Sequence, residues 1–313
     1  MVYIGIDLGG TNVKGALVSE AGEILREESR PTEVARGTDA VCDNIAVVIT
    51  ALAEGVSENE LGGVGVGCPG TVDDEAGIVR YAANLGFADL DLRAQLARRC
   101  GYRVRLGNDA NVAALAEALV GAGKGCDGFL VITLGTGVGV GVVLDGKMLT
   151  GYTGAASEPG HMVIREGGEA CTCGRRGCFE AYASATALIR ETKRAMDAHP
   201  ESAMHAVAAE NGAVDGRTAF TAAQRGDGAA QGVVERYIAD LACGTANLVN
   251  IFFPEVVAFS GGVANQGEAL LAPLREQVRA MTFGSAYAVK HTRIEVCTLG
   301  YRAGVIGAAL LAR

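Results

Sequence analysis

The sequence predicts an α/β protein with two related lobes, and three observations support that prediction. Apolar, strand-like runs alternate with segments of helical spacing, which is typical of a mixed sheet covered by helices. The opening pattern of strand, Gly-rich turn and strand returns 126 residues later, so that Leu8 corresponds to Leu134. The length of 313 residues favours two domains, because one domain commonly takes about 100–200 residues.

The first third of the chain begins with a hairpin. The run VYIGIDLGG (2–10) predicts a buried strand that enters a glycine turn, and VKGALVSEAGEI (13–24) predicts the returning strand. Helical spacing of apolar residues then predicts a helix with Thr38 as its N-cap. A further strand, GVGVGCPG (63–70), ends in a Pro-Gly turn.

The later elements follow the same alternation. We predict a short amphipathic helix over Asp89–Arg99, a strand that stops at Asn108–Asp109, and an Ala-rich helix closed by Gly121. The segment Gly151–Cys178 is polar and Gly-rich, and a loop of this length inside a domain usually has a function. The elements predicted after it are helices over Glu180–His199, Ala229–Val249 and Ala303–Ala312 and strands over 255–260 and 293–299.

Composition and charge restrict the function. Apolar residues make up 49% and charged residues 20%, as in an ordinary globular protein and unlike a disordered one. The 27 basic and 36 acidic residues give a net charge of −9, which argues against general nucleic-acid binding. The chain lacks the basic start of a signal peptide and a stretch suited to spanning a membrane. We therefore expect a cytoplasmic protein with reduced thiols and no membrane partner.

Two glycine turns, Asp7–Asn12 and Thr133–Gly139, offer backbone N–H groups and Thr hydroxyls to phosphate oxygens. Neither is a Walker A loop, and each leads into a strand where a dinucleotide-binding loop leads into a helix. Asp7, at a strand end beside its turn, is well placed to hold Mg²⁺ through water. With the later SGG sequence, Ser260–Gly262, the turns predict a nucleotide cleft. The repeat has two possible explanations. Either the two hairpins are similar by chance, or a domain has been duplicated and its two turns face one cleft.

The NDAN sequence, Asn108–Asn111, ends a strand and begins a helix. One interpretation makes Asp109 the N-cap of that helix. The other makes it a carboxylate at the carboxyl edge of a sheet, where open α/β folds bind ligands. There it can accept the proton of a hydroxyl whose oxygen attacks phosphorus. Both interpretations stay open.

A group of metal-ligand residues lies within 18 residues of sequence: His161, Cys171, Cys173 and Cys178. Three thiolates and one imidazole form a closed tetrahedral set suited to structural Zn²⁺. Three incidental core cysteines are the alternative, but the segment is too polar to belong to a core. A loop held by zinc at 161–178 also positions the flanking Glu158 and Glu180, which are otherwise ordinary surface carboxylates.

These motifs, in this order, resemble the ROK family of sugar kinases, and within it most closely the bacterial ATP-dependent glucokinases. The resemblance covers essentially the whole chain. It is carried by DLGGTN (7–12), GCPGTVD (67–73), NDAN (108–111), TLGTGVGVG (133–141), EPGH (158–161), CTCGRRGCFE (171–180) and SGGV (260–263). It implies the actin-like ATPase (ribonuclease H-like) fold, with two lobes around a nucleotide and sugar cleft. We expect a small lobe of residues 1–117 plus 302–313 and a larger lobe of residues 118–301.

The resemblance implies ATP-dependent phosphorylation of glucose at the C6 hydroxyl, with Asp109 as the general base. The implied sugar-binding residues are Asn84, Asn108, Asp109, Glu158, His161 and Glu180. The residues implied for ATP and Mg²⁺ are Asp7, Gly9, Gly10, Thr11, Asn12, Thr136, Gly137, Gly261 and Gly262. The expected cofactors are ATP, Mg²⁺ and a structural Zn²⁺.

Two other activities are compatible with this family. The first is a kinase for N-acetylmannosamine, N-acetylglucosamine or another hexose, because the same polar residues serve there. The second, from another class, is a sugar-sensing ROK transcriptional repressor. Such repressors carry a winged-helix segment before the first glycine turn, and here that turn begins at Asp7, so we expect a kinase. The expected assembly is a homodimer or a dimer of dimers.

Overall fold

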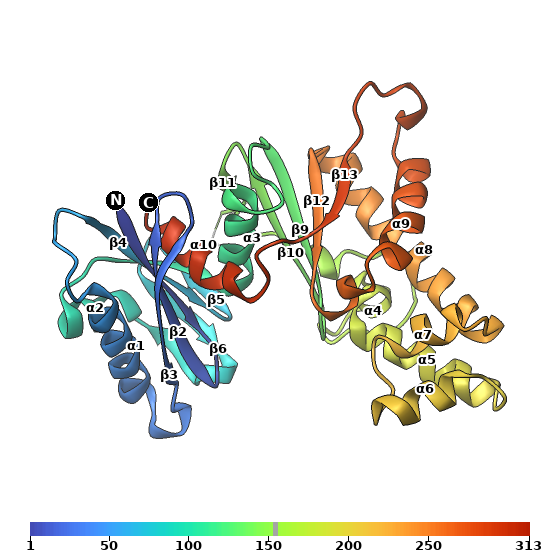
Figure 1. Cartoon of the computed structure of the whole chain (residues 1–313), viewed down its shortest axis with the longest axis horizontal. Coiled ribbons are helices and arrows are strands. Elements are labelled where there is room, and N and C mark those ends of the chain that lie inside the picture. The colour runs from blue at the N-terminus through green and yellow to red at the C-terminus, as the bar shows by residue number, and fades with distance from the viewer. Residues whose placement is uncertain (153–155) are drawn as a thin grey trace. The chain divides into compact units, whose positions relative to one another are not determined.

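The structure, a computed structural model, describes residues 1–152 and 156–313. The chain forms two compact units, whose elements are labelled in Figure 1. Unit 1 comprises Met1–Asp127, Gly141–Ser157 and Thr298–Arg313, and unit 2 comprises Gly128–Val140 and Glu158–Cys297. The predicted lobes, 1–117 with 302–313 and 118–301, stay a prediction. Of the predicted polar loop, residues 153–155 lie outside the described residues.

Unit 1 is built on a five-stranded mixed sheet with the strand order β3-β2-β1-β4-β8. β1 pairs antiparallel with β2 and parallel with β4, and β8 continues the parallel part. Because side chains alternate along a strand, Ile4 and Ile6 of β1 point to one face of the sheet, and Tyr3 and Asp7 point to the other. The strands are β1 (Val2–Leu8), β2 (Asn12–Ser19), β3 (Ile24–Pro31), β4 (Leu61–Cys68) and β8 (Val104–Asn108).

Helices cover both faces of this sheet (Figure 1). α1 (Thr38–Ala53) and α2 (Leu92–Cys100) share a buried apolar cluster with the Ile4 face. α3 (Asp109–Val120) and α10 (Ala303–Leu311) contribute to the cluster on the other face. α10 lies directly on the sheet because β1 has a glycine beneath it: a Cβ on Gly5 would lie 1.9 Å from the carbonyl oxygen of Val305.

Two predicted helix starts in unit 1 were wrong. Thr38 is the first residue of α1, and Gly37 holds the N-cap position with φ 91°. The helix predicted over Asp89–Arg99 begins at Leu92, because the Asp91 side chain caps it. A small antiparallel sheet precedes α2 and consists of β5 (Thr71–Asp73), β6 (Ile78–Ala82) and β7 (Phe87–Leu90).

The second five-stranded sheet has the order β11-β10-β9-β12-β13 and repeats the arrangement of the first. β9 (Gly128–Leu134) begins and ends 126 residues after β1, and β10 (Val138–Leu144) begins 126 residues after β2. β12 (Val256–Ser260) pairs parallel with β9 and with β13 (Arg293–Val296). The short β11 (Lys147–Met148) pairs with β10. The prediction of two related α/β lobes is therefore confirmed.

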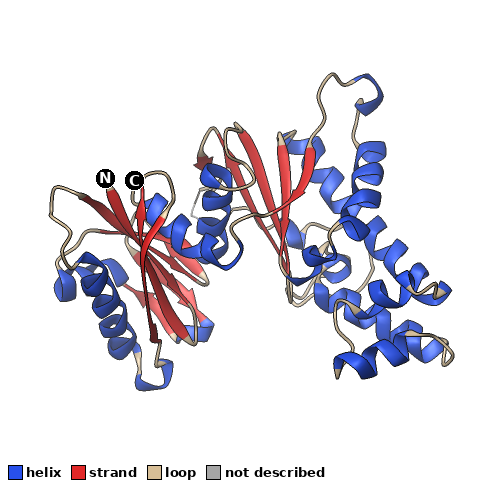
Figure 2. Ribbon diagram, in the orientation of Figure 1, coloured by secondary structure: helices blue, strands red, loops and turns tan. Residues whose placement is uncertain are grey.

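Unit 2 is rich in helices (Figure 2). The helix predicted over Glu180–His199 is divided at Ser184, whose hydroxyl oxygen accepts the N–H of Ala187 at 3.1 Å and caps a new helix. Helices α6, α7 and α9 were not predicted from the sequence. The helices of unit 2 are α4 (Glu180–Ala183), α5 (Ala185–Ala198), α6 (Met204–Asn211), α7 (Thr218–Gln224), α8 (Gly228–Phe252) and α9 (Glu268–Met281).

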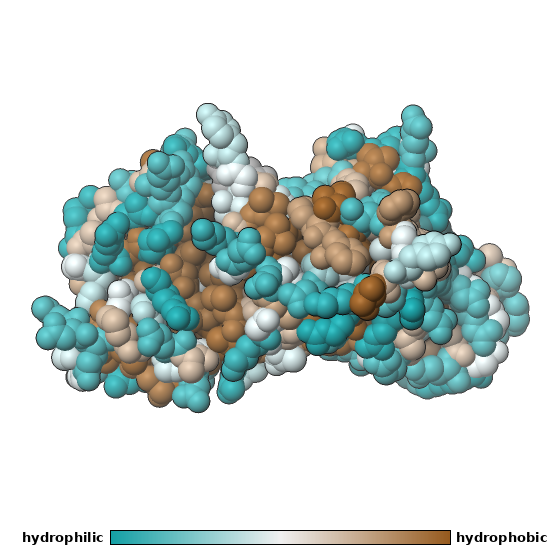
Figure 3. Space-filling view, turned by 90° about the horizontal axis from the view of Figure 1, so that it is seen from above, coloured by the Kyte–Doolittle hydropathy of each residue, from teal (hydrophilic) through white to brown (hydrophobic). Residues whose placement is uncertain are grey.

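The surface is mixed in character. On the face drawn in Figure 3, hydrophilic residues are spread widely and hydrophobic residues lie between them, as on most protein surfaces. In the two described ranges, each helix is either too short or too polar to cross a bilayer.

Candidate functional site

The first glycine turn joins β1 to β2 in unit 1. Gly9 N–H donates to the carbonyl of Asn12 at 3.0 Å, and the Thr32 hydroxyl donates to the carbonyl of Gly9 at 2.5 Å. The N–H groups of Gly10 and Thr11 donate to no acceptor in residues 1–152 and 156–313. Two adjacent free N–H groups are the feature that binds an anion in a backbone nest. The turn therefore suits a phosphate oxygen.

Asp7 is the next-to-last residue of β1, close to this turn. Burial raises the pKa of Asp7, the Lys14 ammonium lowers it, and the charge of Asp109 raises it. Lys14 is the cross-strand partner of Asp7, so both side chains lie on one face of the hairpin. Two carboxylates that repel each other make a favourable place for a divalent cation.

Asn84, a predicted sugar-binding residue, lies beside the first turn. Its Nδ2 atom would be 3.6 Å from a Cβ placed on Gly10. Unit 1 therefore brings together Asn84, the first glycine turn, Asp7 and Asp109.

The structure decides which residue caps α3. The Asn108 side-chain oxygen accepts the N–H groups of Ala110 at 3.0 Å and Asn111 at 3.1 Å, so Asn108 is the N-cap. Asp109 is the first residue of the helix, and its Oδ1 accepts the Ala110 N–H at 2.8 Å. Within the described ranges, its Oδ2 accepts no hydrogen bond. The capping interpretation of Asp109 is wrong, and one of its carboxylate oxygens is available to a ligand.

Asn108 is more fully occupied than the sequence indicated. Besides capping α3, it donates from Nδ2 to the carbonyl of Gly70 at 3.0 Å. Asn108 thereby ties β8 to the turn after Cys68. Burial, and then the charge of Asp109, raises the pKa of Cys68 to about 12, so this thiol stays protonated near neutral pH and is a poor nucleophile.

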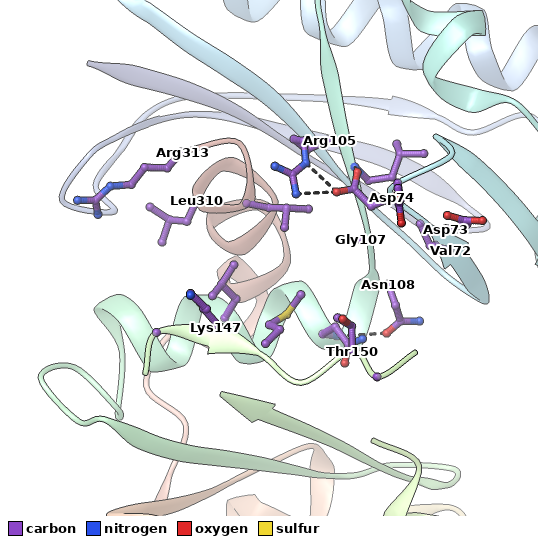
Figure 4. Close-up of a pocket in the computed structure, with 18 of the residues that line it drawn as sticks. Val72, Asp73, Asp74, Arg105, Gly107, Asn108, Lys147, Thr150, Leu310 and Arg313 are labelled. Carbon is purple, nitrogen blue, oxygen red and sulfur yellow. Dashed lines mark hydrogen bonds and ion pairs between the residues drawn. The ribbon is translucent and has the colours of Figure 1, made fainter. Parts of the chain in front are cut away.

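Asn108 also lines a cavity of about 1110 Å³ in unit 1, which was not predicted from the sequence (Figure 4). Its wall carries Asp74, whose carboxylate pairs with Arg105 at 2.7 Å and Arg93 at 2.9 Å. The same carboxylate accepts the Leu106 N–H at 2.7 Å. Asp74 is thus a structural anion that holds the edge strand β8.

The predicted metal ligands meet in unit 2. The ligand atoms of His161, Cys171, Cys173 and Cys178 all lie within 4.8 Å of one another. The distance from Cys171 Sγ to His161 Nδ1 is 3.5 Å, and the Cys173 and Cys178 sulfurs are 3.7 Å apart. Bonds of about 2.3 Å to sulfur and about 2.0 Å to nitrogen place tetrahedral ligand atoms about 3.5–3.8 Å apart. The four side chains therefore fit a tetrahedral metal ion.

The second glycine turn joins β9 to β10. Gly135 N–H donates to the carbonyl of Gly137 at 3.0 Å. Over residues 1–152 and 156–313, the N–H groups of Thr136 and Gly137 donate to no acceptor, as in the first turn. A Cβ on Gly137 would lie 2.2 Å from Glu180 Oε2. The carboxylate of Glu180 therefore reaches this turn only because residue 137 is a glycine.

The SGG turn follows the neighbouring strand β12. The hydroxyls of Ser260 and Thr133 lie 2.8 Å apart, and a Cβ on Gly261 would lie 2.3 Å from the carbonyl oxygen of Leu134. Gly261 also has φ 88°, a conformation that favours glycine. Gly262 begins the short helix that follows. Glu158 directly precedes the turn that holds His161, whose N–H donates to the Glu158 carbonyl at 3.0 Å.

Unit 2 thus gathers the second glycine turn, the SGG turn, Glu180 and the metal ligands. Sequence reasoning missed two threonines that support this group, Thr172 and Thr186. Thr172 donates to Glu180, and Thr186 donates to the carbonyl of Thr136. Neither threonine belongs to a spacing pattern that would have pointed to it.

Two sheets of the same strand order, each opening with a glycine-turn hairpin, define the actin-like ATPase fold. The ROK family model matches residues 3–313, and the chain belongs to the ROK family. Glucokinase from Thermotoga maritima is 40% identical over 307 residues, which are 98% of this chain and 95% of that protein.

A solved structure and a regulator are also similar. A ROK family glucokinase from Streptomyces griseus, in complex with glucose and AMPPNP, superposes with a TM-score of 0.78 at 34% identity, covering 100% of this chain and 99% of that one. The xylose repressor of Caldicellulosiruptor bescii is 30% identical over 97% of this chain and 76% of its own length.

Proposed function

We propose that this protein is an ATP-dependent sugar kinase that phosphorylates glucose at the C6 hydroxyl. Similarity to glucokinases over nearly the whole chain supports sugar phosphorylation. The observation that carries the mechanism is the free Oδ2 of Asp109 at the first residue of α3. A carboxylate with a free oxygen, beside the glycine turn and Asp7, suits a general base for a hydroxyl nucleophile.

In this mechanism Asp109 aligns the C6 oxygen and removes its proton as that oxygen attacks the terminal phosphorus. The bond between this phosphorus and the bridging oxygen breaks, and ADP leaves. Phosphoryl transfer depends mainly on positioning and on neutralising charge. Asp7 would hold Mg²⁺, which supplies positive charge to the phosphate oxygens when bound. The two free N–H groups of each glycine turn donate hydrogen bonds that stabilise the remaining negative charge of the phosphate oxygens.

Each ligand has a proposed set of contacts. Polar side chains suit a polyol, because a buried hydroxyl without a partner is costly. The sugar contacts are Asn84, Asn108, Asp109, Glu158, His161 and Glu180. The contacts to ATP and Mg²⁺ are Asp7, Gly9, Gly10, Thr11, Asn12, Thr136, Gly137, Gly261 and Gly262.

We also propose that the tetrahedral group binds a structural Zn²⁺. Its four protein ligands leave no open coordination position, which is typical of a structural rather than a catalytic zinc. His161, as both zinc ligand and sugar contact, would join the metal loop to substrate binding. We also propose a cytoplasmic location, where cysteine thiols stay reduced. A homodimer or a dimer of dimers stays a prediction.

A coupled ADP-release screen with zinc-loaded protein tests the function. The sugars are glucose, mannose, fructose, N-acetylmannosamine and N-acetylglucosamine. We expect the highest kcat/KM with glucose. A preference for an N-acetyl sugar would replace glucose by the amino-sugar alternative. No ADP release with any sugar, together with sugar-dependent DNA binding, would favour a repressor.

Asp109→Asn tests the mechanism. We expect kcat to fall by about 10²–10⁴-fold, the usual effect of a lost general base, while glucose affinity changes little. Asp39→Asn is the matched control, because Asp39 also lies in the first turn of a helix and is exposed. Turnover of Asp109→Asn within threefold of Asp39→Asn would refute the role of Asp109.

A further inference from the structure

The second glycine turn is held from one side by a single segment, residues 180–186. Val138 N–H donates to Glu180 Oε2 at 3.1 Å. Ala185 N–H donates to the carbonyl of Gly135 at 2.9 Å, and the Thr186 hydroxyl donates to the carbonyl of Thr136 at 2.8 Å. These three bonds fix the carbonyl groups of the turn and the N–H that follows it, and they leave the N–H groups of Thr136 and Gly137 for a ligand.

The same segment follows directly on the metal loop. Cys178 is a metal ligand, and Phe179, fully buried next to it, donates its N–H to the Met162 carbonyl at 2.8 Å. Glu180, the next residue, therefore leaves the metal loop with a fixed backbone position. The side chain of Glu180 contacts both the metal loop, at Thr172, and the glycine turn, at Val138.

Glu180 uses its two carboxylate oxygens for different partners. Oε1 accepts the hydroxyl of Thr172 at 3.0 Å, and Cys171 Sγ lies 3.6 Å from the same oxygen. Oε2 accepts the Val138 N–H. A planar carboxylate that is hydrogen-bonded at both oxygens has one orientation. A displacement of Thr172 would therefore move the Glu180 carboxylate and, with it, the Val138 N–H.

We propose that Glu180 couples the metal loop to the phosphate-binding turn, and that Thr172 is the positioning residue that sets its orientation. The inference rests on the proposed function, because it takes the Gly135–Val138 turn to bind the nucleotide. With the loop closed around its metal ion, Thr172 holds Glu180 Oε1, and Glu180 Oε2 holds the turn with its free N–H groups ready for a phosphate. Supporting hydrogen bonds of this kind fix the orientation of groups around metal sites.

Thr172 is suited to a test because it is not itself a metal ligand. Thr172→Val removes the hydroxyl donor and keeps the shape of the side chain, whereas Thr172→Ser keeps the donor. Both variants are compared with the wild type in zinc-loaded form, with metal content measured for each. The readout is the Kd of AMPPNP, a non-hydrolysable ATP analogue, measured by calorimetry without sugar, followed by KM for ATP and for glucose.

We expect Thr172→Val to weaken AMPPNP binding about three- to tenfold, which corresponds to the net contribution of one typical hydrogen bond. Thr172→Ser is expected to stay within twofold of the wild type. KM for ATP should rise with the Kd, and kcat should change by less than threefold. A zinc-loaded Thr172→Val that binds AMPPNP within twofold of the wild type overturns the coupling.

Glu180→Met tests the other end of the link with a side chain of similar length. Methionine replaces both carboxylate oxygens, so the Thr172 hydroxyl and the Val138 N–H lose their acceptor. We expect at least the same weakening of AMPPNP binding, with metal content measured as for Thr172→Val, and a zinc-loaded Glu180→Met that binds AMPPNP within twofold of the wild type overturns the coupling. The proposed function is refuted if the wild type binds AMPPNP but phosphorylates no sugar. The coupling is judged separately, because the Kd values of the variants test it without any sugar.

Discussion

Glu117 of unit 1 is a carboxylate whose only evident task is structural. It lies near the end of α3 and is 2% exposed. Its Oε2 accepts the N–H groups of Ala122 and Thr298, both at 3.0 Å, and its Oε1 accepts the N–H of Leu299 at 2.7 Å. The Thr298 hydroxyl also reaches Oε2, at 3.3 Å. One side chain thus ties the end of α3 to the segment that enters α10.

Glu117→Gln is expected to destabilise unit 1 by about 1–3 kcal/mol. A glutamine oxygen in place of Oε2 would keep the Ala122 and Thr298 bonds, but the amide nitrogen would then face the Leu299 N–H. The variant therefore loses one charge-assisted hydrogen bond and leaves the part-buried Leu299 N–H without an acceptor. Activity measured in the cold should change less than threefold, since Asp109 lies about 12 Å away along the helix.

Urea unfolding followed by circular dichroism measures this effect, because the chain has no tryptophan for fluorescence. Glu28→Gln on the exposed strand β3 makes the same chemical change and should shift stability by less than about 0.5 kcal/mol. The reasoning is refuted if Glu117→Gln unfolds at the same urea concentration as Glu28→Gln.

Two further results are expected. Metal analysis after dialysis should find one zinc per wild-type chain and none in Cys173→Ser. KM for glucose should rise in this variant, because the metal loop no longer fixes the positions of Glu158, His161 and Glu180. A Cys173→Ser protein that keeps a full zinc would exclude the site. Asp7→Asn should melt at a higher temperature than the wild type at pH 8 while losing Mg²⁺-dependent turnover. Burial raises the pKa of Asp7 above its unfolded value, so the cost of its charge is present above the folded pKa and disappears as the pH falls through it. The gap in melting temperature should therefore shrink towards pH 4, and a gap that grows in acid contradicts this account.

The sequence predicted the repeated hairpins well because their constraints are local. A buried strand that enters a glycine turn leaves the same pattern wherever it occurs, and β9 lies 126 residues after β1 for this reason. The metal group was equally visible, since ligand types and spacing are both written in sequence. Asp109 was predicted as a candidate general base from the sequence. Only the structure excludes a capping role for it, because Asn and Asp both favour the N-cap position and Asn108 is adjacent.

The missed helices lack the signals that sequence reasoning uses. α6 is short and its small apolar residues are scattered around it, and α9 contains Pro273, which predicts a break. The division of the helix predicted from Glu180 depends on Ser184, a residue that is common inside helices as well as at their starts. These features depend on tertiary packing, which a single sequence does not record.

The two glycine turns show how far the repeat extends. Each has one N–H closed onto its own hairpin and two adjacent N–H groups without an acceptor among the described residues. Their supports differ: the first turn is held by Thr32, within unit 1, and the second by the segment that follows the metal loop. The repeat therefore predicts the anion-binding geometry of both turns but not what stabilises either. Because only the second turn is tied to the metal ligands, loss of the metal should disturb the second turn and leave the hydrogen bonds between Thr32 and the first turn intact.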